Sequence, residues 1–95
     1  MIYYKKLVKA NLNNILGGRT LDKLVNIRIG TTVKVEELLS DGYIRERMLA
    51  LGLTKGATID VIRRGPKDNL TLYNIRGTMI ALRKEEGEKI IVSYI

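Results

Sequence analysis

Residues 57–83, ATIDVIRRGPKDNLTLYNIRGTMIALR, contain three apolar segments separated by two short turn sequences. In the first segment, residues 57–64, Ile59 and Val61 alternate with polar neighbours, which is typical of a half-buried strand. Residues 65–69 are turn formers that precede a strand at 70–75, and residues 76–78 turn the chain into a strand at 79–82. Such short connections predict antiparallel strands, because parallel neighbours need long crossovers.

Two further strands flank this region. Residues 32–36 alternate strictly, with Val33 and Val35 on one face, and residues 90–94 form the last apolar segment. The connector at 83–89 is highly charged and has room for one helical turn. Antiparallel strands in a domain this small usually close into a barrel, which removes exposed edges. We therefore predict an all-β fold, a small SH3-like β-barrel of about five antiparallel strands, with one short α-helix between the first two.

That helix is predicted between Ser40 or Asp41, whose side chains can cap its N-terminus, and about Leu51. Gly52 follows where a left-handed residue ends many helices, a conformation that glycine adopts at little cost. Three apolar residues at helical spacing form one stripe, namely Ile44, Met48 and Leu51.

The composition excludes most catalytic and metal chemistry. The 95 residues are 45% hydrophobic and 28% charged, as expected for one soluble globular domain. There is no cysteine and no histidine, so disulfides, thiolate ligands, imidazole ligands and a serine–histidine triad are ruled out. We expect no enzyme activity and no tightly bound cofactor, although weak contact of a metal with carboxylates is left open.

Neither the carboxylates nor the glycines suggest a site. Adjacent glutamates on a strand, such as Glu36 and Glu37, point to opposite faces and make a poor acid–base pair. We interpret this pair and the cluster at 85–88 as solvated charges. Gly52, Gly56 and Gly65 are spaced as turns and not as a phosphate-binding loop. No catalytic, cofactor-binding or metal-binding residue is therefore predicted.

The formal net charge of +7 is unevenly distributed. Residues 1–20 contain four basic residues and no acidic one, whereas residues 21–95 contain thirteen basic and ten acidic residues. We predict a basic N-terminal extension, residues 1–20, followed by one domain, residues 21–95. The extension has apolar residues at helical spacing and is interpreted as a frayed helix or a strand covering a barrel edge. The alternative is a basic amphipathic segment that contacts an anionic membrane surface.

No segment is long enough to span a membrane. The longest apolar stretch, residues 48–53, is far shorter than the ~20 residues that a spanning helix needs. Lysines also interrupt the only apolar stretch near the start, which disfavours a secretory signal. We predict a cytoplasmic location.

A positive charge also raises the alternative of a small basic SH3-like nucleic-acid-binding protein of the ribosomal kind. Readers of single strands need aromatic platforms among basic residues. This sequence has no Phe and no Trp, and its five tyrosines are scattered. Nucleic-acid binding is therefore the less favoured function.

Protein binding fits the predicted helix better. Arginines beside aliphatic anchors are common at interface cores, and the helix has both. The predicted partner-binding residues are Arg45, Arg47, Met48 and Leu49. The alternative is that the apolar stripe only packs the helix onto the barrel. Structural turns are predicted at Gly52, Gly56, Pro66 and Gly77, and a homo-oligomer is left open.

Two runs of residues resemble the FeoA family, ferrous iron transport protein A. The first is Leu21-x-x-Leu24, Gly30, Val33, Val35 and then Gly42-x-x-Arg45-x-Arg47-Met48-Leu49-x-Leu51-Gly52-Leu53-x-x-Gly56. The second is Arg63-Arg64-Gly65-Pro66, Ile75-Arg76-Gly77, Ala81-Leu82-Arg83 and Ile90-x-Val92. The resemblance covers residues 21–95. After Pro66 the family often has Leu-Gly-Asp-Pro, whereas this chain has the shorter Lys67-Asp68-Asn69.

The resemblance implies an SH3-like barrel in the bacterial cytoplasm that assists FeoB, a membrane ferrous iron transporter with a cytoplasmic GTPase domain. The family is similar to the C-terminal SH3-like domain of iron-dependent repressors of the diphtheria-toxin-repressor type. Ferrous iron would be the transported ion. Since the chain lacks histidine and cysteine, we expect a non-enzymatic accessory or regulatory protein that acts by contact with the transporter.

Overall fold

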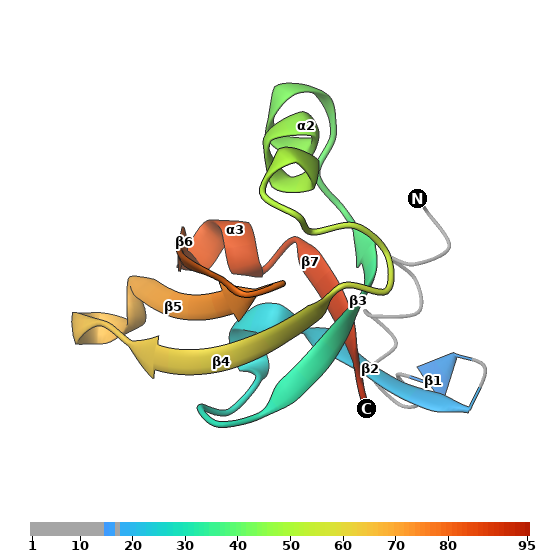
Figure 1. The fold of residues 1–95 in the computed structure, drawn as a ribbon, viewed down its shortest axis with the longest axis horizontal. Coiled ribbons are helices and arrows are strands. Elements are labelled where there is room, and N and C mark those ends of the chain that lie inside the picture. The colour runs from blue at the N-terminus through green and yellow to red at the C-terminus, as the bar shows by residue number, and fades with distance from the viewer. Residues whose placement is uncertain (1–14, 17) are drawn as a thin grey trace.

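Seven strands form one antiparallel sheet in the computed structural model, which describes residues 15–16 and 18–95. The strands are β1 (Ile15–Leu16), β2 (Arg19–Lys23), β3 (Thr32–Leu38), β4 (Thr58–Arg64), β5 (Leu70–Ile75), β6 (Thr78–Arg83) and β7 (Ile90–Tyr94). Their order is β1-β2-β7-β3-β4-β5-β6, and the sheet curves strongly around the core (Figure 1). The predicted mainly β fold is confirmed. In the described part of the chain, β1 and β6 are the outer strands and do not pair with each other.

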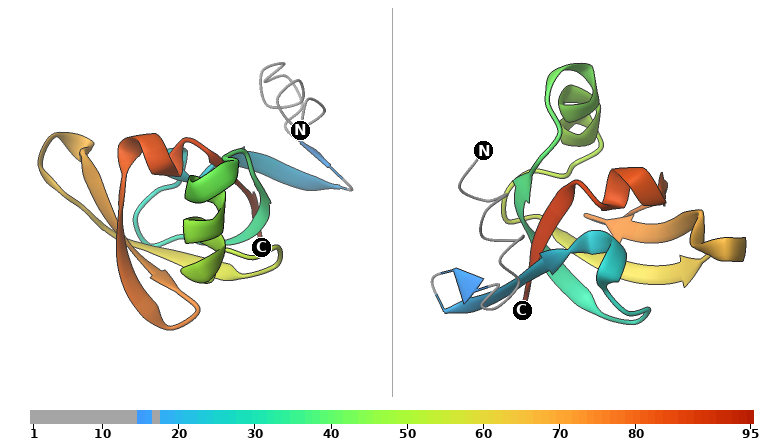
Figure 2. Two further views of the ribbon diagram at one scale, coloured as in Figure 1. Left: turned by 90° about the horizontal axis from the view of Figure 1, so that it is seen from above. Right: turned by 180° about the vertical axis from the view of Figure 1, so that it is seen from behind.

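Two α-helices and two 3₁₀ turns interrupt the strands. Helix α2 (Gly42–Ala50) lies between β3 and β4, as predicted, and α3 (Lys84–Gly87) is the single turn expected in the charged connector. The 3₁₀ turns are η1 (Leu24–Asn26) and η2 (Pro66–Asp68). Figure 2 shows that α2 stands across one end of the curved sheet, beyond the strand layer.

The three strands that determine the fold pair in the predicted order. β4 pairs with β5, and β5 pairs with β6 without a register shift from Ile75↔Thr78 to Leu70↔Arg83. The turn between β5 and β6 has positive φ at both central residues, 52° at Arg76 and 88° at Gly77. A two-residue hairpin of this kind needs positive φ at both positions, which explains the glycine.

The core lies between the two halves of the sheet. Val33, Val35, Ile59 and Val61 are buried, in agreement with the alternation in the sequence. Apolar side chains of η1, α2, β5, β6, β7 and two loops complete the same cluster, among them Leu24, Ile27, Met48, Leu53, Tyr73, Ile75, Leu82, Ile90 and Val92. Burial of these residues is the main source of stability.

The sequence analysis missed the two strands nearest the N-terminus. β2 pairs with β7 through Leu21↔Ser93 and Asp22↔Val92, and β1 forms a hairpin with β2. A strand at a sheet edge was one of the interpretations of residues 1–20, and the described residues 15–16 and 19–20 have that structure. The apolar pattern up to residue 12 and the proposed membrane contact lie outside the described residues.

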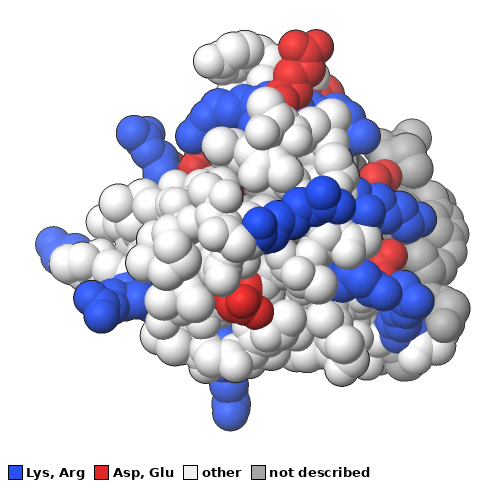
Figure 3. Space-filling model, in the orientation of Figure 1, with Lys and Arg blue, Asp and Glu red and all other residues white. Residues whose placement is uncertain are grey.

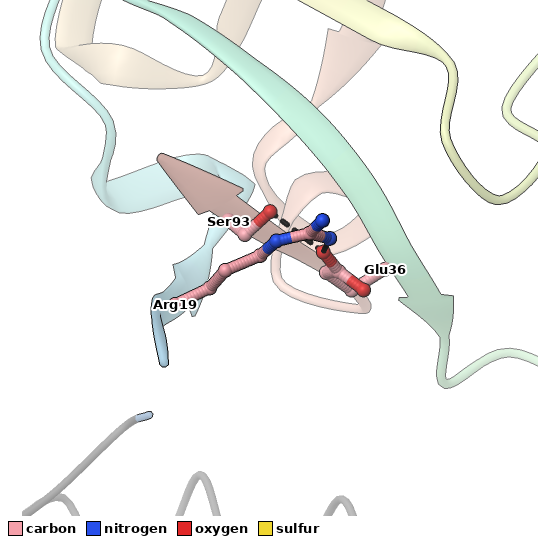
Figure 4. A network of polar contacts seen from close by, with 3 residues as sticks. All are labelled: Arg19, Glu36 and Ser93. Atoms are coloured by element: carbon pink, nitrogen blue, oxygen red, sulfur yellow. Dashed lines mark hydrogen bonds and ion pairs between the residues drawn. The ribbon is translucent and has the colours of Figure 1, made fainter. Parts of the chain in front are cut away.

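Glu36 differs from its predicted state as a solvated charge. It lies where the β3–β7 register shifts between Val35 and Glu37, and its side chain is buried. The Ser93 hydroxyl donates a hydrogen bond to Glu36 Oε2 at 2.7 Å, and Arg19 Nη1 lies 3.1 Å from the same oxygen (Figure 4). Burial raises the pKa of Glu36, but these two hydrogen bonds and the positive charges of Arg19 and Lys55 outweigh it, so the pKa is lowered. The carboxylate therefore links β2, β3 and β7.

Candidate partner-binding surface on helix α2

Helix α2 ends in a motif that matches the sequence prediction. Gly52 has a φ of 101°, its N–H donates to Leu49 O at 3.0 Å, and the Leu53 N–H donates to Met48 O at 3.1 Å. This pair of bonds is the Schellman motif, and the buried side chains of Met48 and Leu53 supply the apolar residues that usually accompany it. The N-terminus differs from expectation. Asp41 is the N-cap residue, but its side chain makes no capping hydrogen bond.

Burial separates the predicted partner-binding residues into two groups. Met48 is 1% exposed and lies in the core, so it anchors the helix and is not part of the accessible surface. This corrects its expected role in direct contact. Leu49 is 37% exposed, and Ile44, expected on the buried stripe, is 43% exposed. Tyr43, which is 77% exposed, is a third exposed apolar residue of α2.

Arg45 connects α2 to the end of β3. Its Nη1 donates a hydrogen bond to Leu38 O at 3.1 Å, and the residue is half-buried. The N–H of Arg45 also donates to Asp41 O at 3.2 Å, the first bond of the helix. The guanidinium thus satisfies a strand-end carbonyl, a structural contact that the sequence pattern did not indicate.

Arg47 connects α2 to α3. Its guanidinium donates to Glu86 Oε2, and Glu86 Oε1 accepts the N–H of Arg83 at 2.8 Å, which is half of a capping box. Burial raises the pKa of Glu86, whereas the hydrogen bonds from Arg47 and Arg83 and their charges lower it, with a net lowering. Because the Arg47 side chain is still 41% exposed, it remains accessible to a partner.

A pocket of about 370 Å³ lies beside the N-terminal end of α2. Apolar atoms come from Leu39 and Ile44, and charged groups surround them; the lining residues are Leu39, Ser40, Asp41, Ile44, Glu85, Glu86 and Lys89. Figure 3 shows basic and acidic side chains side by side over α2, at the top of the molecule. The surface therefore combines exposed apolar groups with charges of both signs, which is typical of protein-binding sites.

The sequence analysis did not predict that Glu86 lies beside helix α2. Glu86 was interpreted as a solvated charge, although Arg83-x-x-Glu86 has the spacing of a helix N-terminal box. The predicted turn residues are all in turns. Gly52 follows α2, Gly56 precedes β4 with a φ of 88°, Pro66 begins η2 and Gly77 is in the β5–β6 hairpin.

Three further features of the described residues concern acidic clusters, tyrosines and helix length. In residues 15–16 and 18–95, no three acidic side chains converge into a group that could hold a metal ion. Among the described tyrosines, Tyr73 is in the core, Tyr43 is on α2 and Tyr94 ends β7, so these three share no aromatic platform. None of the described helices combines the length and apolarity that a membrane crossing requires.

Comparison with known proteins gives a family and a fold. The model of the FeoA domain matches residues 23–94. A fusion of Fe(2+) transport protein A with the Fe(2+) transporter FeoB, from Porphyromonas gingivalis, is 29% identical over 73 residues. These are 77% of this chain but only 9% of the fusion protein, so the chain corresponds to a small part of that relative.

Solved structures agree with this match. The solution structure of FeoA from Chlorobium tepidum has a TM-score of 0.74 and 28% identity over 78% of this chain and 70% of that one. FeoA from Stenotrophomonas maltophilia, solved as a zinc complex and described as a prokaryotic SH3 domain protein, has a TM-score of 0.64 and 26% identity. That alignment covers 73% of this chain and 86% of the other, and it confirms the predicted SH3-like fold.

Proposed function

The chain belongs to the FeoA family, and from this premise we propose that it assists ferrous iron uptake by binding the cytoplasmic GTPase-containing region of a FeoB-type transporter. In this proposal it resides in the cytoplasm and acts by contact, without catalysing a reaction. Ferrous iron is the transported ion, and the chain itself holds no tightly bound metal.

The supporting observation is the fusion relative. There, a segment similar to 77% of this chain is part of the same polypeptide as a FeoB transporter. Covalent linkage keeps two modules at high effective concentration, which is useful when they work in contact. In this proposal the FeoA domain of the present chain contacts the transporter through its own exposed surface.

We propose that this surface is the exposed side of α2. Tyr43 and Leu49 provide apolar area, and Arg47 provides an accessible charge. Aromatic residues and arginine contribute most of the binding energy in many interfaces. Met48 supports this surface from the core, so its effect on binding would be indirect.

The experiment is a titration of the full chain with the purified soluble domain of a FeoB-type transporter. Variant Tyr43→Ala with Leu49→Glu should weaken binding at least about tenfold, because it removes two exposed anchors. Ile29→Glu is the matched control, since Ile29 is 54% exposed in the loop before β3, away from α2 (Figure 1). Equal binding by both variants would show that α2 is not the contact surface.

The charges of α2 need a separate variant. Arg45→Glu with Arg47→Glu should also weaken binding, but Arg47→Glu would face Glu86 and disturb the α2–α3 contact. Arg47→Gln is therefore the cleaner change, because it removes the charge without placing two carboxylates together. If Arg47→Gln binds as tightly as the unmodified chain, Arg47 serves only the internal contact.

A further inference from the structure

Strand β6 is an unprotected edge of the sheet. It has six residues, Thr78–Arg83, and in the described part of the chain it pairs with β5 alone. Natural edge strands are usually shortened or interrupted by proline or a bulge. β6 contains no proline, and its register with β5 has no shift.

The register determines which backbone groups point away from β5. Residues flanking a two-residue hairpin turn, here Ile75 and Thr78, exchange hydrogen bonds, and bonded pairs then alternate along the strands. The Lys84 N–H donates to Asn69 O at 3.0 Å, as this alternation requires. The N–H and C=O groups of Met79 and Ala81 are consequently directed toward the open edge, whereas the Arg83 N–H donates to Glu86 Oε1 at 2.8 Å.

The face of the sheet beside this edge is mostly apolar, with Asn74 and Arg83 as its polar residues. Paired residues share a face, so Leu70, Leu72, Met79 and Ala81 lie on the side opposite to the buried Tyr73 and Leu82. Met79 is 55% exposed and Leu70 is 46% exposed. Figure 3 shows a largely uncharged surface where β5 and β6 lie, with basic side chains around it.

The charges around β6 identify the kind of occupant. Arg76 is exposed at one end of the strand, and Arg83 and Lys84 are exposed at the other. Antiparallel pairing of two β6 strands would bring the Arg83 end of one copy to the Arg76 end of the second, and each copy has a formal net charge of +7. Like charges opposed in this way are destabilising, so a second copy is a poor occupant.

We propose that β6 accepts an extended segment of another protein as an additional strand, and that this segment has apolar residues at alternate positions between acidic ends. Strand addition supplies main-chain hydrogen bonds to Met79 and Ala81, and the apolar face accepts alternate side chains of the segment. The acidic ends meet Arg76 at one end and Arg83 with Lys84 at the other. This surface is separate from the exposed side of α2 that the proposed function uses.

The probe is a synthetic peptide with blocked ends, Asp-Glu-Val-Thr-Val-Thr-Val-Glu-Asp, titrated into the isotope-labelled full chain. We expect the largest amide shifts at Met79 and Ala81, and slower hydrogen exchange of these two amides in the complex. A peptide with lysine in place of every acidic residue is the charge control, and it should bind at least tenfold more weakly. Equal binding of the two peptides would overturn the assignment of an acidic partner.

Ala81→Pro tests the edge itself. It removes an N–H that points away from β5, so the β5–β6 pairing is left intact, and proline is tolerated at such edge positions. The variant should lower peptide affinity at least tenfold and leave binding to the transporter domain unchanged. Ala81→Lys, which blocks the edge without proline, should give the same result if Ala81→Pro does not fold.

Two results would overturn the proposal. One is peptide binding by both Ala81 variants that equals binding by the unmodified chain. The other is concentration-dependent dimerisation in sedimentation that both variants abolish, since the edge would then be occupied by a second copy. Neither result bears on the α2 surface, which Tyr43→Ala with Leu49→Glu tests separately.

Discussion

The guanidinium of Arg47 on α2 donates to the carboxylate of Glu86 on α3, so two residues 39 positions apart in the sequence join two short helices. Glu86 also accepts the N–H of Arg83, so the end of β6 is part of the same contact. Because α2 stands across one end of the sheet, this contact and the one from Arg45 to Leu38 O determine how the helix is held (Figure 2).

Glu86→Gln should weaken the attachment of α2 to the rest of the fold while changing the free energy of unfolding only slightly. Glutamine keeps an oxygen for the Arg83 N–H but loses the charge that faces Arg47. Since the Arg47 side chain is 41% exposed, solvent screens the pair and the unfolding midpoint should change little. Hydrogen exchange of the α2 amides should become faster. Glu85→Gln is the control and should leave the hydrogen exchange of the α2 amides unchanged. If Glu86→Gln also leaves it unchanged, the expectation is contradicted.

Short-range patterns in the sequence predicted most of the strands and the main helix. Alternation placed Val33, Val35, Ile59 and Val61 in the core, and Gly52 marked the end of α2. These features depend on local geometry, so a single sequence contains them. β2 was missed because Arg19–Lys23 has little alternation, and part of its pairing is with β7 at the other end of the described chain.

The candidate site was predicted less completely, because its contacts are tertiary. Arg45, Arg47 and Leu49 were predicted to bind a partner, but neither the hydrogen bond to Leu38 O nor the pair with Glu86 follows from helical spacing. Glu36 is the clearest case. Its burial depends on Ser93, 57 residues away, and on Arg19 from a strand that the sequence pattern did not reveal.

Acid should destabilise the fold partly through Glu36. Its folded pKa is lowered relative to the ordinary value of 4.5, so the unfolded chain takes up the proton first as the pH falls. The associated stability is present above pH 4.5 and is lost as the pH decreases through the lower folded pKa. Urea unfolding at about pH 7 and about pH 3 should show this loss.

Glu36→Gln should reduce that pH dependence. At neutral pH we expect destabilisation of about 1–3 kcal/mol, because the Ser93 hydroxyl and Arg19 lose a buried charged acceptor. As the pH falls from 4.5 through the lower folded pKa, the difference from the unmodified chain should shrink, because Glu36 takes up a proton first in the unfolded chain and then in the folded one. Glu86, whose pKa is also lowered, contributes to the same slope, so Glu86→Gln measured in parallel separates the two. If the free energies of unfolding of Glu36→Gln and of the unmodified chain differ by the same amount at both pH values, the role of Glu36 is contradicted.

Gly52→Ala should destabilise the protein by about 1–2 kcal/mol, the usual cost of a left-handed conformation in a residue with a Cβ. The strain comes from the backbone, because an added Cβ would lie at ordinary contact distance, 3.6 Å from Arg76 Cδ. Gly87→Ala is the matched control. Its φ is not in the left-handed region, and its Cβ would lie 3.5 Å from Val25 Cβ. Thermal unfolding of the two variants should therefore differ, and equal midpoints would contradict the Schellman geometry.

The proposed absence of a tightly bound metal can be measured directly. The carboxylates of the described residues do not converge, so equilibrium dialysis under anaerobic conditions should find no ferrous ion retained at micromolar concentration. A full-length sample is required, because residues 1–14 contribute lysines and tyrosines that the structure does not describe. Retention of one equivalent of iron would contradict the proposal that the chain acts by contact alone.

Met48→Ala and Leu49→Ala should separate the support of α2 from its binding surface. Met48 is 1% exposed, so its truncation leaves a core cavity and should cost about 2–5 kcal/mol of unfolding free energy. Leu49 is 37% exposed, and its truncation should change the unfolding free energy by only about 0.5 kcal/mol.

Binding should respond in the opposite way. If α2 contacts the transporter, Leu49→Ala should weaken binding although the variant is as stable as the unmodified chain. Met48→Ala should then bind normally at low temperature, where the variant remains folded, and lose binding as it unfolds. Weak binding by folded Met48→Ala together with normal binding by Leu49→Ala would place the contact on another surface.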